Sequence, residues 1–250
     1  MCTVILLLRP GHAWPVLIAA NRDELLDRPW DPPDSHWPEQ PGVVAGRDRL
    51  GGGTWMALHG GLVAAVLNRP GSLGPAPGKL SRGGLPLMAV QHRSAAAASG
   101  AMLALDGGAY RSFNMVLADR HSAHSIRGLG FGQPEGWKLP PGLHVVTADD
   151  PNDLANLRTR AQLPRFAAAA VPDAARGDWG EWQALHGDRS GVPAAALNVP
   201  PHDGFGTVCS SLVGLPASGE PVWMFAAGPP DQAAFTRVAP AAAVVTEVPR

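Results

Sequence analysis

Cys2 is the residue whose position in the chain most clearly suggests chemistry. It follows the initiator Met1. Methionine aminopeptidases remove an initiator that stands before a small residue, so we expect Cys2 to become the first residue, with a thiol and a free α-amine. The amine has a pKa of about 7.7–8.0 and the thiol one of about 8.5, so the amine can accept the thiol proton near neutral pH, directly or through a water. This is the N-terminal form of a nucleophile paired with its base; the alternative is a small apolar residue that begins a core strand.

A polar cluster at Asn21–Glu24 follows directly on an apolar run and is expected at the end of a buried strand. If that strand pairs with Thr3–Leu8, the cluster lies beside Cys2. Asp23 would then hold and orient the α-ammonium, and the positive charge of Arg22 would lower the thiol pKa. The alternative is a solvated turn with a local ion pair.

Asn68 ends another apolar run and precedes a Pro-Gly turn. Its amide can donate a hydrogen bond to an oxyanion, although an Asn at this position also suits a turn. A second group of residues is predicted to contact the substrate. Three tryptophans, Trp30, Trp37 and Trp55, would line an apolar pocket, and Asn21 would also bind the substrate. The other cysteine, Cys209, is predicted to be a thiol of the core.

Three weaker motifs predict no separate site. The segment 74–80 is like a phosphate-binding loop, but its spacing is one residue short and no Ser or Thr follows Lys79. His121 and His124 have the spacing of metal ligands without a nearby third ligand, so we predict no metal site. Gly51–Gly53 is interpreted as a hairpin or bulge, or as a place where a ligand approaches the backbone closely.

Short strands and few helices must position these residues. Strands are predicted at Thr3–Leu8, Pro15–Ala20, Val43–Ala45, Thr54–Leu58, Leu62–Leu67, Phe113–Ala118, Ser125–Arg127, Leu143–Thr147, Thr207–Leu215 and Val222–Ala227. Helices are predicted at Leu85–Leu105 with a break near Gly100, at Leu154–Val171 with an interruption at Pro164, and at Trp179–Leu185. A Pro-rich loop is predicted at Pro29–Gly42. Strands, then helices, then strands, with hairpin connections, indicate an α+β fold with mainly antiparallel sheets and helices packed outside.

Composition limits the classes of function. The 250 residues are 45% hydrophobic and 16% charged, and 30 Gly and 26 Pro favour short elements joined by tight turns. A net charge of −1 without a basic stripe gives no support for a nucleic-acid partner. The first apolar run is too short for a secretion signal or a membrane span, so a cytoplasmic protein with reduced thiols is predicted. We expect one domain over residues 1–237, followed by a tail or short strand at 238–250.

Four motifs in order resemble the NRDE family, also called transport and Golgi organisation 2-like proteins: Met1-Cys2-Thr3, Asn21-Arg22-Asp23-Glu24, Gly52-Gly53-Thr54-Trp55 and Asn68-Arg69-Pro70. Weaker agreement at Leu139–His144 and Gly206-Thr207 extends the resemblance over nearly the whole chain. That family is similar to the cysteine N-terminal-nucleophile hydrolases, such as penicillin V acylase and bile-salt hydrolase. The resemblance implies a four-layer αββα sandwich and cleavage of a non-peptide amide bond. It assigns Cys2 as nucleophile, Arg22 and Asp23 as assisting residues and Asn68 as part of the oxyanion hole.

Two departures from the acylase pattern leave two functions open. The stretch Val145–Asp150 lacks the second oxyanion Asn, and Gly206–Cys209 lacks the late Arg. Losing one oxyanion donor typically costs about 10²–10³ in rate. The first function is a cysteine amidase for an N-acyl or similar small-molecule amide, without a cofactor. The second is a non-catalytic carrier of haem, a lipid or an acyl-CoA, with Cys2 or a histidine as a haem ligand.

Overall fold

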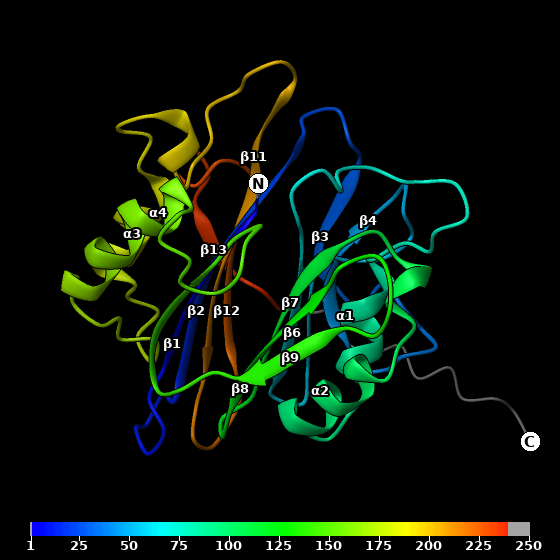
Figure 1. Ribbon diagram of the computed structural model, residues 1–250. Coiled ribbons are helices and arrows are strands. Elements are labelled where there is room, and N and C mark those ends of the chain that lie inside the picture. The colour runs from blue at the N-terminus through cyan, green and yellow to red at the C-terminus, as the bar shows by residue number, and fades with distance from the viewer. Residues whose placement is uncertain (1, 240–250) are drawn as a thin grey trace, which may run out of the picture.

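The computed structural model describes residues 2–239, in which two antiparallel sheets are stacked face to face and covered by helices on their outer sides (Figure 1). The first sheet contains, in spatial order, β10 (Gly142–Val146), β1 (Thr3–Leu8), β2 (Val16–Leu25), β11 (Phe205–Leu215), β12 (Val222–Ala226) and β13 (Phe235–Arg237). The second contains β3 (Trp30–Asp34), β4 (Val44–Asp48), β5 (Met56–His59), β6 (Leu62–Asn68), β7 (Phe113–Ala118), β8 (Ala123–Gly128) and β9 (Glu135–Lys138).

Helices α3 (Leu157–Ala168) and α4 (Gly180–Gly187) pack on the first sheet, and α1 (Gly84–Ala89) and α2 (Ala95–Leu103) on the second. Two single 3₁₀ turns lie at Gly107–Ala109 and Pro193–Ala195. This arrangement confirms the predicted α+β class and the four-layer αββα sandwich. Among residues 2–239, none of the helices combines the length and the apolarity that crossing a membrane would need.

The opening hairpin forms as predicted, but the polar cluster is part of its second strand. In the β1–β2 pairing Thr3 lies opposite Asn21, so Cys2 falls opposite Arg22. The prediction that Asn21–Glu24 follows the strand is wrong, because β2 pairs with β11 along its whole length, from Val16 to Leu25. The whole cluster therefore pairs with β11, and Asn21 pairs with β1 as well, which fixes the direction of each polar side chain.

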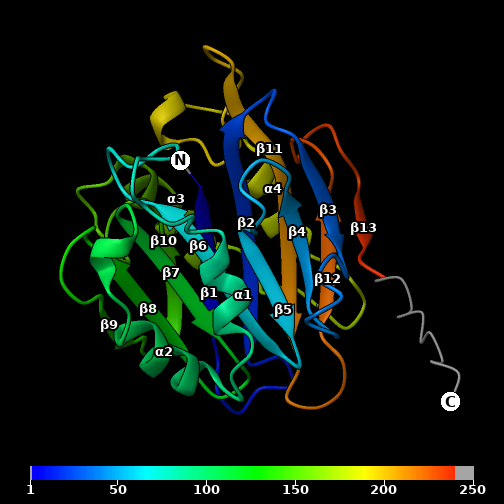
Figure 2. The same cartoon turned by 90° about the vertical axis from the view of Figure 1, so that its right-hand side faces the viewer.

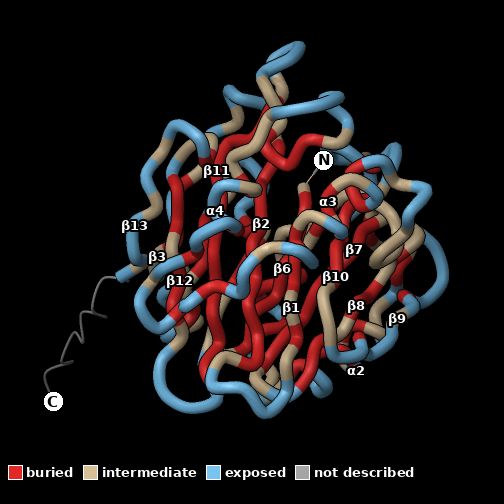
Figure 3. Tube along the Cα trace, turned by 90° about the vertical axis from the view of Figure 1, so that its left-hand side faces the viewer, coloured by how far each residue is buried: buried red, intermediate tan, exposed pale blue. Residues whose placement is uncertain are grey.

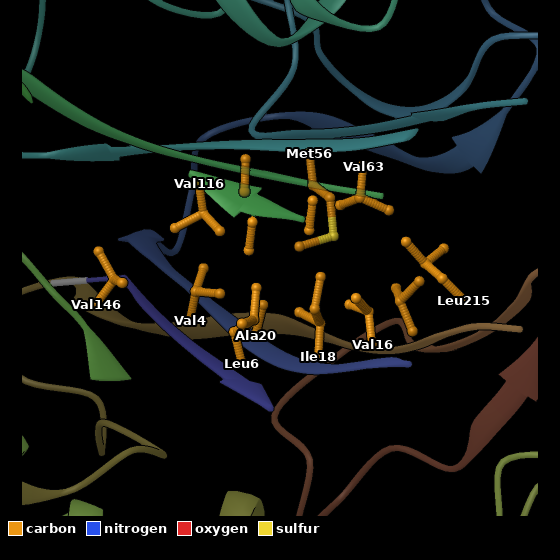
Figure 4. Close-up of a cluster of buried hydrophobic side chains, with 14 of the residues drawn as sticks. Val4, Leu6, Val16, Ile18, Ala20, Met56, Val63, Val116, Val146 and Leu215 are labelled. Carbon is orange, nitrogen blue, oxygen red and sulfur yellow. The ribbon is translucent and has the colours of Figure 1, made fainter. Parts of the chain in front are cut away.

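Alternation along β2 separates its side chains between two layers. Val16, Ile18 and Ala20 face the second sheet and meet side chains such as Met56 and Val63 in the core between the sheets (Figure 4). The intervening residues Leu17 and Ala19 pack in a different cluster, under α3 and α4. Continuing the alternation, Arg22 points between the sheets and Asp23 points toward the helices.

Each pair of neighbouring layers has its own apolar core. The core between the sheets, that beneath α1 and α2, and that beneath α3 and α4 are separate clusters of buried side chains. Burial follows the strands, whereas the loops at both ends of the sandwich are exposed (Figure 3). Cys209 is buried in the core between the sheets, as predicted.

The helices differ from the prediction in their interruptions. The predicted helix Leu85–Leu105 is two helices, and the break precedes Ser94 and does not fall at Gly100. Ser94 ends the break because its side chain accepts a hydrogen bond from the backbone N–H of Ala97, which begins a new helix. Helix α3 continues through Pro164, where only one backbone donor is lost.

Three strands lie outside the predicted set. The Pro-rich loop contains β3, and β9 and β13 are short strands at the edges of the two sheets. β3 is likewise an edge strand, of the second sheet. An edge strand pairs with a neighbour on one side only, so it can contain a proline or be very short. Of the predicted tail, Val238 donates its backbone N–H to Trp223, while residues 240–250 lie outside the described residues.

His186 on α4 gives the fold a dependence on pH. Burial lowers its pKa to about 4, so the folded protein holds a neutral imidazole. In the unfolded chain a histidine titrates near pH 6.5. As pH falls from 6.5 toward 4, the unfolded chain binds a proton that the folded protein does not, so stability present above pH 6.5 is lost in this window.

We expect the free energy of unfolding to fall by about 2 kcal/mol through His186 between pH 7 and pH 5. Urea unfolding at the two pH values, compared between wild type and His186→Leu, measures this contribution. The same comparison for the exposed His121 in a His121→Leu variant serves as the control. An equal pH dependence in wild type and His186→Leu would contradict the prediction.

Candidate active site

A cavity of about 570 Å³, here named the Cys2 cavity, opens at the end of the sandwich where the chain begins. Its walls come from Cys2 directly before β1, the end of β2, the loop between β4 and β5, the end of β6, and the segment between β6 and α1. Figure 2 shows this segment passing the chain start at the same end of the molecule. A larger hollow of about 790 Å³ lies on the outer side of α4, but no cysteine lines it. The Cys2 cavity is therefore the candidate site.

The Cys2 thiol lies against the backbone of Asp23. The Asp23 N–H donates to Sγ at 3.4 Å, and Sγ lies 3.5 Å from the Asp23 carbonyl oxygen. Burial raises the pKa of the Cys2 thiol, and the negative charge of Asp23 raises it further, more than Arg22 lowers it. Arg22 does act in the predicted direction and lowers the thiol pKa, but burial and Asp23 have larger effects. At neutral pH the thiol is protonated and needs a base before it can attack.

Asp23 is fixed on the helix side of the first sheet. Thr207 Oγ1 donates to Oδ1 at 2.6 Å, and Arg158 Nη1 on α3 donates to Oδ2 at 3.1 Å. The same Nη1 atom donates to Thr3 Oγ1 at 2.9 Å. Arg158 thus ties the Asp23 carboxylate to the start of β1.

Arg158 is the buried charged residue of this site that the sequence prediction missed. Helix α3 buries Arg158, Gln162 and Phe166, which stand at intervals of four residues and so share one face. A charged residue on the same helical face as a buried Phe was the available signal. The same pattern also occurs where a charged residue lies at the exposed edge of an apolar helical face, so it does not by itself predict that Arg158 is buried.

Arg22 is held between the two sheets. Its Nη2 donates to Asp48 Oδ2 at 3.0 Å, and its guanidinium lies 4.4 Å from the centre of the Trp55 ring. Arg28 binds the same carboxylate through both Nε and Nη2, at 2.6 and 3.1 Å. Glu24 lies 3.7 Å from each arginine. The charges of Arg22 and Arg28 are therefore balanced by neighbouring carboxylates.

Asn68 lines the Cys2 cavity, as its predicted role requires. No hydrogen bond joins its side chain to any of residues 2–239, so its amide is open to a bound molecule. The amide of Asn114 is instead occupied: its oxygen accepts from Arg69, and its nitrogen donates to the carbonyls of Thr147 and Asp149. Asn114 therefore anchors the end of β10, which lacks the second oxyanion Asn.

The predicted substrate-binding residues lie in different places. Trp55 lines the cavity, and Trp30 packs edge-on against it with ring centres 5.9 Å apart, without lining the cavity itself. Trp37 packs against the core beneath α1 and α2. Asn21 points toward the helices, where its amide nitrogen donates to the Leu197 carbonyl at 2.9 Å. The structure thus brings Cys2, Arg22, Asp23, Asn68 and Trp55 together and places the other three outside.

The glycines before Thr54 make room for a wall of the cavity. The Thr54 N–H donates to the Gly83 carbonyl at 2.8 Å. A Cβ on Gly53 would lie 2.3 Å from the carbonyl carbon of Gly83. The close approach at Gly53 is therefore made by the chain's own backbone.

Comparison with known proteins supports the same fold. Residues 1–166 match the sequence profile of the family described as Transport and Golgi organisation 2. No curated protein matches the chain in sequence. Among solved structures, the Caenorhabditis elegans N-acylethanolamine-hydrolyzing acid amidase ortholog is similar with a TM-score of 0.59 and 12% identity, over 88% of this chain and 94% of that chain. At this identity the likeness concerns the fold alone.

Proposed function

Since the chain belongs to the Transport and Golgi organisation 2 family, we propose that its N-terminal-nucleophile-hydrolase scaffold cleaves a linear, non-peptide amide through Cys2. The observation that carries the proposal is the position of the Cys2 thiol on a cavity, with the fixed Asp23 carboxylate beside the start of the same strand. Arg158 binds both this carboxylate and the side chain of Thr3, so we expect the α-amine of Cys2, once Met1 is removed, to lie within reach of the carboxylate. Asp23 then orients the amine, which acts as the base.

The α-amine first takes the proton of the Cys2 thiol, and Sγ forms a bond to the amide carbonyl carbon. The resulting oxyanion accepts a hydrogen bond from the amide of Asn68. The C–N bond breaks, and the leaving amine takes the proton from the α-ammonium. Water then attacks the thioester with the α-amine again as base, and the C–S bond breaks as the thiol regains its proton. The net reaction converts amide and water into a carboxylic acid and an amine.

A covalent acyl-enzyme is the direct test. Purified protein is incubated with N-octanoyl amides of neutral and anionic amines, quenched in acid and analysed by intact mass. We expect a chain without Met1 and an added octanoyl group on the peptide that contains Cys2. The buried Cys209 provides the matched control: Cys209→Ser should retain the adduct, and Cys2→Ala should lose it. Retained Met1, or turnover by Cys2→Ala, would refute the mechanism.

Binding without turnover is the second candidate. The raised thiol pKa and a single side-chain amide from Asn68 at the cavity suit a weak nucleophile with an incomplete oxyanion hole. The ligand would be haem, a lipid or an acyl-CoA. Among residues 2–239, Cys2 is the one typical haem ligand that lines the cavity, since none of the described His, Met or Tyr residues is in its walls. A haem titration of Cys2→Ala against wild type tests this version, and identical spectra would remove it. For either function we propose a cytoplasmic protein, in which both thiols stay reduced.

A further inference from the structure

One part of the wall of the Cys2 cavity contains three cations, Lys79, Arg82 and Arg111, here named the basic wall. Within residues 2–239 none of the three forms an ion pair with a carboxylate. Arg22 and Arg28, by contrast, share Asp48 and Glu24. The cavity therefore has arginines that are paired with carboxylates and, in the basic wall, three cations that form no ion pair within the described residues.

Backbone carbonyls hold the basic wall in place. Arg111 donates to the carbonyls of Gly71, Leu73 and Pro75 at 2.6, 2.9 and 3.0 Å. Arg82 Nη1 donates to Ser72 Oγ at 2.8 Å and to the Ser112 carbonyl at 3.0 Å. Neutral oxygens fix the positions of the two guanidinium groups without cancelling their charge. Holding charges in position before a ligand arrives reduces the cost of binding.

Arg82 and Arg111 also repel one another electrostatically. Burial lowers the pKa of Arg82 to about 10, and the positive charge of Arg111 contributes to the lowering. Keeping two cations together in a partly desolvated wall is unfavourable, and an anion between them would relieve the repulsion. Arg82 and Cys2 line the same cavity, which places the basic wall within reach of a molecule bound at the thiol.

We propose that the basic wall binds an anionic group, a carboxylate or a phosphate, on the molecule whose amide carbonyl meets Cys2. The inference rests on the proposed function for the carbonyl at Cys2, but the binding of the anion does not depend on catalysis. The substrate class is then an N-acyl amide with a charged amine part, the acyl chain lying toward Trp55.

Binding to the full-length Cys2→Ala protein separates this inference from catalysis. Three probes share one acyl chain: N-octanoylethanolamine is neutral, N-octanoylglycine carries a carboxylate, and N-octanoyl-O-phosphoethanolamine carries a phosphate. Calorimetry should give Kd values at least about tenfold lower for an anionic probe than for the neutral one, the scale of a hydrogen bond to a charged group. The order of the two anions identifies the preferred group.

Arg111→Gln and Arg82→Gln should each raise the Kd of the anionic probe about tenfold and leave that of the neutral probe unchanged. A variant that only disordered the loop would weaken all three probes alike, which would count against the proposal. Arg120→Gln is the matched control, because Arg120 also donates to a carbonyl, that of Ala217, away from the cavity.

Equal affinity for neutral and anionic probes, or no binding of either anion, would overturn the inference even if Cys2 forms an acyl-enzyme. Selective binding of an anion without any acyl-enzyme in wild type would instead support the basic wall and refute the amidase. The two proposals can thus fail separately.

Discussion

A glycine inserted before Cys2 is expected to abolish amide hydrolysis while the thiol and the fold remain in place. The insertion converts the α-amine of Cys2 into a peptide N–H, which cannot accept a proton. Loss of a nucleophile or of its base typically costs on the order of 10⁴-fold or more in rate. Two chains made by cleaving a fusion partner, one beginning at Cys2 and one at the added Gly, are compared by kcat/KM for an N-octanoyl amide.

The α-amine is the base in this prediction because the cavity offers no better one. No histidine lines the Cys2 cavity, and the carboxylates of Glu24 and Asp48 are engaged by arginines. The Asp23 carboxylate lies on the helix side of the sheet, so its backbone, and not its side chain, contacts Sγ. Since burial raises the thiol pKa, unaided ionisation near pH 7 is unfavourable.

Circular dichroism and complete alkylation of Cys2 in the denatured protein confirm that the glycine-extended chain is intact. Cys2→Ala should lose as much activity as the extension, and Cys209→Ser should lose little, since Cys209 lies in the core. Undiminished turnover by the extended chain would mean that another group deprotonates the thiol.

The hairpin that carries the site could be predicted because its signals are local. An apolar run, a Pro-Gly turn and a second apolar run indicate two paired strands, and the observed register brings Cys2 opposite Arg22. What the sequence did not indicate was that β2 continues through Leu25. Four polar residues in a row are typical of a turn, and only the pairing of β11 along β2 keeps them in a strand.

That continuation changes the roles expected for neighbouring residues. As strand residues, Arg22 and Asp23 face opposite sides of the sheet, so they do not act on the thiol as a pair. The side chains that meet Asp23 come from α3 and β11, more than a hundred residues away. Contacts between residues so far apart in sequence depend on how the layers stack, and local sequence patterns do not predict that stacking.

The buried ion pair between Asp23 and Arg158 leads to a prediction about stability. Arg158→Met should lower the free energy of unfolding by about 3–5 kcal/mol, because the buried carboxylate loses its guanidinium partner while its desolvation remains. Replacing both residues in Asp23→Leu/Arg158→Met should cost less than the sum of the single changes, since no charge is then left in the interior. Urea unfolding of the four proteins at pH 7 measures this coupling.

The exposed pair Arg176–Asp173 supplies the matched control. Arg176→Met should change stability by no more than about 0.5 kcal/mol, because solvent screens that pair. If Arg158→Met were equally mild, the pair would not constrain the chain start.

If Arg158→Met is strongly destabilising, a smaller change in the contacts of the Asp23 carboxylate is needed to separate an effect on folding from an effect on catalysis. Thr207→Val removes the hydrogen bond to Oδ1 and keeps Arg158 in place. If Asp23 orients the α-amine, Thr207→Val should lower kcat more than it raises KM. If the variant only reduced the amount of folded protein, kcat and KM per active molecule would both be unchanged.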